Sequence, residues 1–328
     1  MKGKTYLGID VGSVSTNIVA IDDDCNVLEK LYLRTSGKPI KVLLSGMREI
    51  QMRLGGQTHI NAIGTTGSGR QLASVIVGAD VVKTEIPAHA IAAQKLVPNV
   101  RTVIVIGGQA SKIIFSQDGV VTDFAMITVC AAGTGSFLDR QAGRLEIPIE
   151  EFGQYALKAD APVRIAGRCA VFAESDMIHK QQTGHTTENI VAGLCEALVR
   201  NYLNNLAKSK ELHSPIIFQG GVAANVGIVA AFEKELKTKI IIPEHYDVMG
   251  AYGCALLARN KAKASGYKGK DFSFNDLSHS YQTKSIECKD CSNNCEILEI
   301  CSDKITIARW GDKCGKWTSQ ISNKVVSE

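Results

Sequence analysis

The sequence predicts an α/β protein with two lobes built on one plan and a small cysteine-rich segment at the C-terminal end. The chain has 328 residues, roughly twice the common size of one domain. A strand, a glycine turn and a second strand follow one another at residues 5–21 and again at 102–115. The composition changes near residue 265, and five of the ten cysteines follow it. We therefore expect lobes at 1–95 and 96–265 and a separate segment at 266–328.

The predicted elements follow from apolar periodicity and from turn residues. The first lobe begins with a three-stranded meander at 5–9, 17–21 and 27–33, followed by a helix at 41–54 and a strand at 60–64. A helix at 87–96 leads to the second lobe, whose strands are expected at 102–106, 113–115, 120–124, 215–218 and 240–242. Helical spacing follows residue 135 and recurs at 171–178, 223–236 and 250–260.

The composition argues against several classes of function. Apolar residues make up 45% and charged residues 21% of the chain, as in ordinary globular proteins. The net charge of +4 arises from 37 basic and 33 acidic side chains without a basic stripe, so no nucleic-acid partner is expected. No apolar run reaches the roughly 18 residues that a membrane helix needs. The first ten residues contain no apolar export signal, so we expect a cytoplasmic protein without membrane contacts whose cysteines do not form disulfides.

Glycine-rich turns at strand ends predict a binding site for phosphate groups. Two predicted strands flank the run Asp10-x-Gly12-Ser13-x-Ser15-Thr16, whose backbone N–H groups and hydroxyls can surround an anion. Asp10 ends the first strand and can hold Mg²⁺ through water. A similar strand ends in Gly107-Gly108-Gln109, and Gly220-Gly221 opens a helix. The chain contains neither the P-loop motif nor a correctly spaced G-x-G-x-x-G, so those two ways of binding phosphate are excluded.

Three turns of the chain have the sequences Gly8-Ile-Asp-Val-Gly-Ser13, Gly107-Gly-Gln-x-Ser-Lys112 and Gly220-Gly-Val-Ala-x-Asn225. They resemble turns of the actin/hexokinase/Hsp70 superfamily of ATPases. Within it, the activators of 2-hydroxyacyl-CoA dehydratases and the benzoyl-CoA reductase ATPase subunits (BadF/BadG/BcrA/BcrD type) have segments similar to Cys130-Ala-Ala-Gly-Thr-Gly135 and Gly167-Arg-Cys-Ala-Val-Phe-Ala-Glu-Ser175. The resemblance covers roughly residues 4–262. It implies two RNase H-like lobes, with mixed sheets and flanking helices, around a nucleotide cleft.

The resemblance also implies an activity, an ATPase coupled to electron transfer. The protein would be a homodimer with one [4Fe–4S] cluster between its subunits, and it would pass low-potential electrons from a ferredoxin or flavodoxin to a dehydratase- or reductase-type iron–sulfur enzyme. Asp10 and Gln109 would be catalytic. ATP or ADP and Mg²⁺ would be held by Gly12, Ser13, Val14, Ser15, Thr16, Gly107, Gly108, Gly133, Thr134, Gly135, Gly220, Gly221 and Asn225.

Two cysteines are candidate cluster ligands. Cys130 and Cys169 each precede a predicted helix, and a helix N-terminus favours a thiolate and an anionic cluster. Such a cluster needs four thiolates, and a two-fold axis would supply the second pair. A buried structural role is the alternative for either cysteine alone. We interpret Cys25, Cys195 and Cys254 as core or incidental residues because they lack ligand spacing.

Three positions depart from the family pattern near the expected γ-phosphate. Val105, Ala110 and Ile127 stand where the family usually has an acidic residue, Asp and Asn. One interpretation is natural drift, with Asp10 holding the metal alone. The other is a protein that binds nucleotide but hydrolyses it slowly, because phosphoryl transfer depends on placed charge. A nucleotide sensor or metal scaffold therefore stays open as an alternative function, and a small-molecule kinase on this fold is a weaker one.

The C-terminal segment contains dense metal-ligand spacing. Its cysteines are Cys288, Cys291, Cys295, Cys301 and Cys314. Zinc and a second Fe–S cluster both fit this spacing, and it resembles the segment that follows the ATPase domain in some large activases. Trp310 and Trp317 flank Cys314, which indicates packing against an apolar surface.

Overall fold

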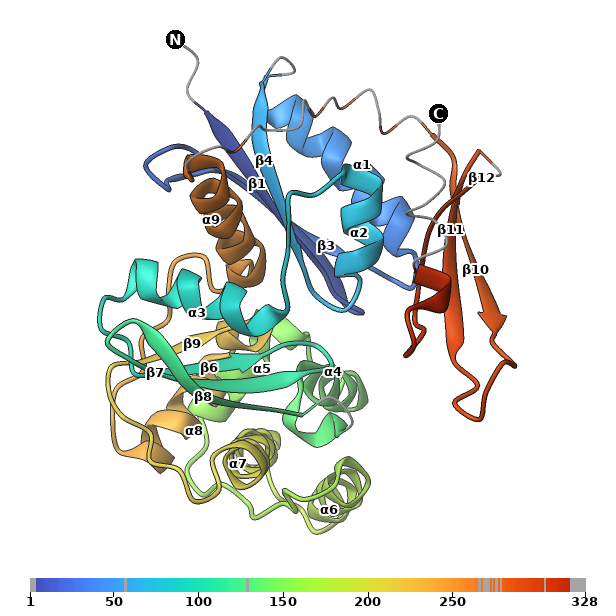
Figure 1. The fold of residues 1–328 in the computed structure, drawn as a ribbon. Coiled ribbons are helices and arrows are strands. Elements are labelled where there is room, and N and C mark those ends of the chain that lie inside the picture. The colour runs from blue at the N-terminus through green and yellow to red at the C-terminus, as the bar shows by residue number, and fades with distance from the viewer. Residues whose placement is uncertain are drawn as a thin grey trace.

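The computed structural model describes residues 4–55, 58–127, 130–264, 267, 272, 274, 277, 279–303 and 305–318. It has two lobes with a sheet each and a third, C-terminal sheet (Figure 1). Across the described ranges, we find no helix long and apolar enough to cross a lipid bilayer.

The first lobe is built on a five-stranded sheet in the order β3-β2-β1-β4-β5. Strands β1, β2 and β3 form an antiparallel meander, and β4 lies parallel to β1. Helices α1 and α2 cover one face, where their apolar residues share a core with alternate residues of β1 and with Ile60 and Ile63 of β4. The elements are β1 (Thr5–Val11), β2 (Ser15–Ile21), β3 (Val27–Arg34), α1 (Pro39–Arg53), β4 (Ile60–Thr66), α2 (Arg70–Val77) and β5 (Val81–Val82).

The second lobe repeats this plan with a four-stranded sheet in the order β8-β7-β6-β9. Strands β6, β7 and β8 form the meander, and β9 lies parallel to β6 as β4 lies to β1. The predicted duplication of the strand–turn–strand unit is therefore confirmed. The elements are β6 (Thr102–Ile106), β7 (Ser111–Gln117), β8 (Val120–Ile127), the 3₁₀ helix η1 (Ala131–Gly133), α4 (Gly135–Arg144), α5 (Ile149–Leu157), α6 (Ala170–Gln182), α7 (Thr187–Leu206), β9 (Ile216–Gln219), the 3₁₀ helix η2 (Gly221–Ala224) and α8 (Val226–Leu236).

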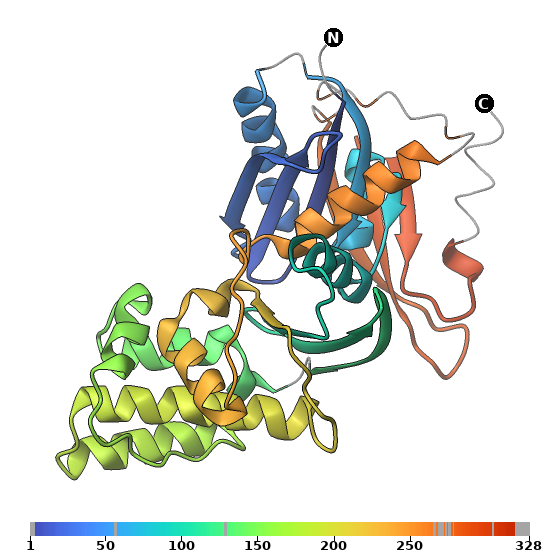
Figure 2. The same cartoon turned by 90° about the vertical axis from the view of Figure 1, so that its left-hand side faces the viewer.

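Two helices connect the lobes. Helices α3 (Glu85–Leu96) and α9 (Met249–Lys263) pack against each other between the two sheets (Figures 1 and 2). A side chain at Gly8 would overlap the carbonyl of Ala251, and one at Gly253 would overlap that of Ala88. These glycines let α9 approach both β1 and α3. The range 96–265 predicted for the second lobe therefore includes a helix, α9, that packs on the first.

The C-terminal segment forms a sheet that the sequence pattern does not predict. Strands β10 (Tyr281–Glu287), β11 (Glu296–Ser302) and β12 (Ile305–Trp310) are antiparallel. Ile300 is buried in the same core as α1 and α2, with Trp310 packed beside it. The predicted apolar contact of Trp310 is thus present, and the sheet lies against the first lobe (Figure 1).

Candidate nucleotide cleft and paired cysteines

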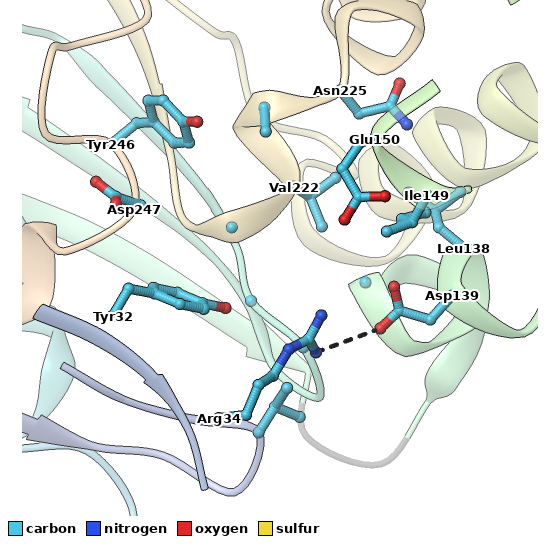
Figure 3. A pocket seen from close by; sticks show the side chains of 16 residues that line it. Tyr32, Arg34, Leu138, Asp139, Ile149, Glu150, Val222, Asn225, Tyr246 and Asp247 are labelled. Carbon is cyan, nitrogen blue, oxygen red and sulfur yellow. Dashed lines mark ion pairs between the residues drawn. The ribbon is translucent and has the colours of Figure 1, made fainter. Parts of the chain in front are cut away.

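Two adjoining cavities lie between the lobes. The larger has a volume of about 430 Å³, and the smaller, of about 150 Å³, reaches Asp10. Figure 3 shows the larger cavity, with side chains from both lobes facing it. The predicted site residues that line one or both cavities are Asp10, Gly12, Ser13, Val14, Ser15, Gly107, Gly108, Gln109, Gly135, Gly220, Gly221 and Asn225.

The two hairpin turns of the cleft share one backbone design. The N–H of Gly12 donates to the carbonyl of Ser15 at 2.8 Å, and the N–H of Gly107 donates to that of Ala110 at 3.0 Å. A side chain at Gly108 would lie 2.5 Å from Val14. The turns therefore meet across the cleft, with backbone and small side chains toward the cavity, as anion binding requires.

Three predicted nucleotide residues support the cleft without lining it. The Thr35 hydroxyl donates to the carbonyl of Gly12 at 2.9 Å, so Thr16 must be the donor in its 3.0 Å bond to Thr35. The Gly133 carbonyl accepts a hydrogen bond from Ser111 at 2.6 Å, and Thr134 is fully buried. Thr16, Gly133 and Thr134 therefore support the turns from the side away from the cavities.

Asp10 is half-buried and lines the smaller cavity. Side chains at Gly67 and Gly250 would overlap its carboxylate oxygens, so both glycines make room for it. Burial raises the pKa of Asp10 to about 6, the charge of Glu85 adds to this, and the nearby Lys112 opposes it. No hydrogen bond to the Asp10 carboxylate is found within the described ranges. An oxygen ligand of this kind fits Mg²⁺.

Sequence reasoning missed several charged and aromatic residues of the cleft. Lys112 is buried and pairs with Glu85 at 3.7 Å. A lysine inside an apolar strand is a signal that could have found it. The larger cavity is lined by Tyr32, Arg34, Asp139, Glu150, Tyr246 and Asp247. Arg34 of the first lobe reaches Asp139 of the second at 3.8 Å (Figure 3).

The segments that carry Cys130 and Cys169 meet on one side chain. Asn201 of α7 donates to the carbonyl of Gly167 at 2.5 Å. On its other side, a side chain at Gly133 would lie 2.8 Å from Asn201 Oδ1. Both thiols are partly exposed. Cys169 is the N-cap residue of α6, as predicted, whereas Cys130 precedes η1 and not α4.

A chain of hydrogen bonds joins the second glycine turn to the segment after Cys130. The N–H groups of Gly135 and Ser136 donate to the carbonyls of Gly107 and Gly108, both at 2.9 Å. The Ser136 hydroxyl also donates to Gly108 at 2.5 Å. These bonds attach the start of α4 directly to the turn.

The tail cysteines do not form a closed metal site. Among the described residues, which include all five, no group of three or more His, Cys, Asp or Glu side chains is arranged to hold a metal ion. Cys288 is buried, and Cys295 pairs with it through a backbone hydrogen bond of 2.8 Å. Cys301 is buried in β11, beyond the turn that carries Cys291. A second metal site at this end thus remains a prediction.

The other cysteines and the three atypical positions are also placed. Cys25, Cys195 and Cys254 are buried, as expected for core residues, and burial raises the pKa of Cys195 to about 12. Val105 and Ala110 line the smaller cavity, whereas Ile127 lines neither and packs at the end of β8.

A family model described as the BadF/BadG/BcrA/BcrD ATPase family matches residues 7–258. The chain belongs to this family. It is 34% identical over 260 residues to the (R)-2-hydroxyglutaryl-CoA dehydratase activating ATPase of Acidaminococcus fermentans, with 78% of this chain and 97% of that protein covered. It is 29% identical over 205 residues to a subunit of benzoyl-CoA reductase from Thauera aromatica, covering 61% and 71%.

A solved structure agrees with the fold. The activator of the 2-hydroxyisocaproyl-CoA dehydratase from Clostridium difficile with bound ADPNP matches with a TM-score of 0.73 and 31% identity, covering 82% of this chain and 99% of that one. The predicted family, the two-lobed fold and the assignment to an ATPase family are therefore confirmed. Strands β10–β12 lie outside the family match.

Proposed function

We propose that the protein is an ATP-dependent reductive activator. Two copies would share one [4Fe–4S] cluster through Cys130 and Cys169 of each, and would pass electrons from a ferredoxin or flavodoxin to a dehydratase- or benzoyl-CoA-reductase-type enzyme. One observation carries the proposal: the phosphate-binding turn at Gly107–Gly108 is hydrogen-bonded to the segment that follows Cys130. The names of the relatives described above support the same class of function.

The cleft residues would bind and orient the nucleotide. The facing glycine turns would donate backbone N–H groups to the phosphates, and Asp10 and Gln109 lie beside them in the smaller cavity. Asp10 would hold Mg²⁺, which neutralises charge on the phosphates when bound. Lys112 adds a positive charge at the same end of the cleft.

The surroundings of the two thiols fit a shared cluster. One chain offers two partly exposed thiols at this place, and a cubane cluster takes four. Beside Cys169, Val171 and Phe172 are 69% and 65% exposed, and Phe124 and Met126 on β8 are about half exposed. Large exposed apolar side chains mark an interaction surface, and a second copy would cover them while completing the ligand set.

Anaerobic purification tests this proposal. We expect a brown dimer with about four iron atoms per dimer and broad absorbance near ~400 nm, both lost in Cys130→Ala and in Cys169→Ala. The variant Cys195→Ala, which alters a buried cysteine, should keep the iron. A wild-type protein that stays colourless and free of iron, even after reconstitution with iron and sulfide, contradicts the proposal.

A second candidate is a nucleotide-binding protein that hydrolyses ATP slowly. Val105 and Ala110 place apolar groups in the smaller cavity next to Asp10, where charge would assist phosphoryl transfer. We expect low steady-state turnover at saturating Mg²⁺, and a rise of about tenfold or more in Ala110→Asp. Ile127→Asn is the control, because Ile127 does not line the cleft. Turnover that Ala110→Asp leaves unchanged contradicts this interpretation.

A further inference from the structure

His89 of α3 faces the same point of the cleft as Asp10, and the function proposed above leaves it without a role. The side chain is 6% exposed and lines the smaller cavity. A side chain at Gly250 would overlap Asp10 Oδ2 and would lie 3.5 Å from His89 Nε2. The imidazole nitrogen and the carboxylate therefore both lie beside Gly250, at the wall of the smaller cavity.

Gln219 fixes which nitrogen of His89 carries the proton. Gln219 is fully buried at the end of β9, and its Nε2 lies 3.3 Å from the His89 carbonyl oxygen and 3.0 Å from His89 Nδ1. A carbonyl oxygen only accepts, so the group that faces it must be the amide nitrogen. Nδ1 then accepts the second amide hydrogen, and the proton of the ring sits on Nε2.

In this orientation, the amide oxygen of Gln219 is left unsatisfied by the residues that the structure describes. Gln219 Oε1 is buried and has no hydrogen-bond partner within the described residues, and an unsatisfied buried acceptor is unfavourable. Burial also lowers the pKa of His89 to about 3, so the ring is neutral at physiological pH. His89 therefore presents one N–H donor to the cleft and has no free acceptor nitrogen, which excludes it as a general base.

We infer that His89 is a catalytic hydrogen-bond donor for ATP hydrolysis, with Gln219 as its positioning residue. The inference rests on the proposed ATPase function. His89 Nε2–H donates to the oxygen of the attacking water and holds that water in place, and one proton of the water passes to a γ-phosphate oxygen. The oxygen then bonds to the γ-phosphorus, the bond from phosphorus to the bridging oxygen breaks, and ADP leaves. His89 keeps its proton throughout.

The arrangement also connects the lobes. Asp10 belongs to β1 of the first lobe and Gln219 to β9 of the second, and His89 lies on the connecting helix α3. The donor is thus aligned only when both lobes hold their places around α3. Water positioning would depend on cleft closure for this reason.

Steady-state ATPase kinetics of three variants test the inference. His89→Phe keeps the ring size without the donor, and we expect kcat to fall about 10²-fold with little change in KM. His89→Gln carries an amide N–H of similar reach and should recover part of the loss. Gln219→Leu removes the amide that fixes the tautomer of His89 and should also lower kcat, because the ring proton can then move to Nδ1. A kcat unchanged in both His89→Phe and Gln219→Leu overturns the inference.

Two further measurements separate structural failure from the proposed role. Nucleotide affinity and melting temperature should stay near wild type, and Asn204→Gln, on the exposed face of α7, serves as control. In the nucleotide-free protein, ¹H–¹⁵N NMR of the imidazole nitrogens should show the Nε2–H tautomer for the resonance missing in His89→Gln. The Nδ1–H tautomer overturns the inference while ATP turnover persists. If the wild type does not turn over at all, the proposed function fails, and the inference with it.

Discussion

Asn201 holds two separate segments at the thiols. Its amide nitrogen bonds to the carbonyl of Gly167, and its amide oxygen lies against Gly133. The residue is 2% exposed, so its substitution leaves unpaired polar groups inside the protein. We therefore expect Asn201 of α7 to help set the spacing of Cys130 and Cys169.

If the proposed cluster is present, Asn201→Asp is expected to lower the iron content of the purified protein several-fold. The carboxylate keeps the shape of the amide but repels the Gly167 carbonyl, so the segment before Cys169 should shift. Asn204→Asp on the same helix, where the residue is exposed, is the matched control. Iron and sulfide analysis after anaerobic purification measures the effect. Wild-type iron in Asn201→Asp would show that this contact does not position the thiols.

The raised pKa of Asp10 makes the free energy of unfolding depend on pH. Its pKa is about 6 in the folded protein against 3.8 for the free group. Between these values the unfolded chain has lost the proton and the folded chain still binds it, so the free energy of unfolding falls as pH rises from about 4 to about 6. Above that range the destabilisation is constant. In the metal-free folded protein, ionisation of the Asp10 carboxylate therefore lowers the free energy of unfolding.

Asp10→Asn should remove this loss of stability, because the amide does not ionise. In chelator and without nucleotide, we expect the variant to match wild type near pH 4 and to be more stable at pH 7 by about 1–3 kcal/mol. Asp118→Asn, in the exposed β7–β8 turn, is the control. Urea unfolding at a series of pH values measures the difference. Equal stability of Asp10→Asn and wild type at pH 7 would contradict the raised pKa.

The sequence predicts those site residues whose neighbours lie close along the chain. Asp10, Gly12 and Gly107 belong to turns that are local in sequence, so their pattern alone indicates a phosphate site. His89 and Asn201 act through contacts with residues far away in sequence, such as Gln219 and Gly167. No local pattern marks such residues, and only the fold brings their partners together.

Helices and strands, like site residues, are predicted only where a local sequence pattern marks them. The strands beside the glycine turns were predicted because alternation and turn residues coincide there. Helix α7 was missed because most of its residues are buried, polar Asn189 and Asn201 among them, so its apolar residues do not follow a clear 3.6-residue period. The predicted helix at 223–236 is divided at Asn225, whose side chain accepts from the Ile228 N–H at 3.1 Å and caps α8.

The C-terminal sheet permits a sharper prediction for the tail cysteines. Cys288, Cys291 and Cys295 lie at the β10–β11 turn, and Trp317, three residues after Cys314, donates from Nε1 to Cys288 Sγ at 3.3 Å. Cys301 lies at the other end of β11 and contacts Thr306 at 3.6 Å. A tail metal site would therefore use four cysteines without Cys301, which suits a tetrahedral Cys₄ site.

Elemental analysis of purified protein tests this assignment. Cys291→Ala should lose the tail metal, zinc or iron, and should melt at a lower temperature, because a structural metal contributes folding free energy. Cys301→Ala should keep the metal. Chelator treatment should reproduce the effect of Cys291→Ala. If both variants bind as much metal as the wild type, the tail contains no such site.

At the scale of the whole molecule, the cleft and the thiols are joined by one short backbone path. We expect nucleotide binding to draw the two glycine turns together around phosphate, and the turn at Gly107–Gly108 is hydrogen-bonded to Gly135 and Ser136. The start of α4 would then move with the turn, and Cys130 lies five residues before it. Because packed interfaces favour discrete arrangements, the two thiol pairs of a dimer would differ in geometry between the ATP and ADP states.

Ser136→Ala should weaken the coupling between nucleotide binding in the cleft and the geometry of the thiols. The substitution removes the hydroxyl bond to Gly108 but leaves the cavity walls intact, so ATP affinity should stay near wild type. In the wild-type protein, as the proposed dimer, we expect faster loss of iron to a chelator with a non-hydrolysable ATP analogue than with ADP, and we expect Ser136→Ala to reduce that ratio several-fold. Ser175→Ala, an exposed hydroxyl on α6, should preserve it. An unchanged ratio in Ser136→Ala would mean that the signal reaches the cluster by another route, such as the Arg34–Asp139 ion pair across the cleft.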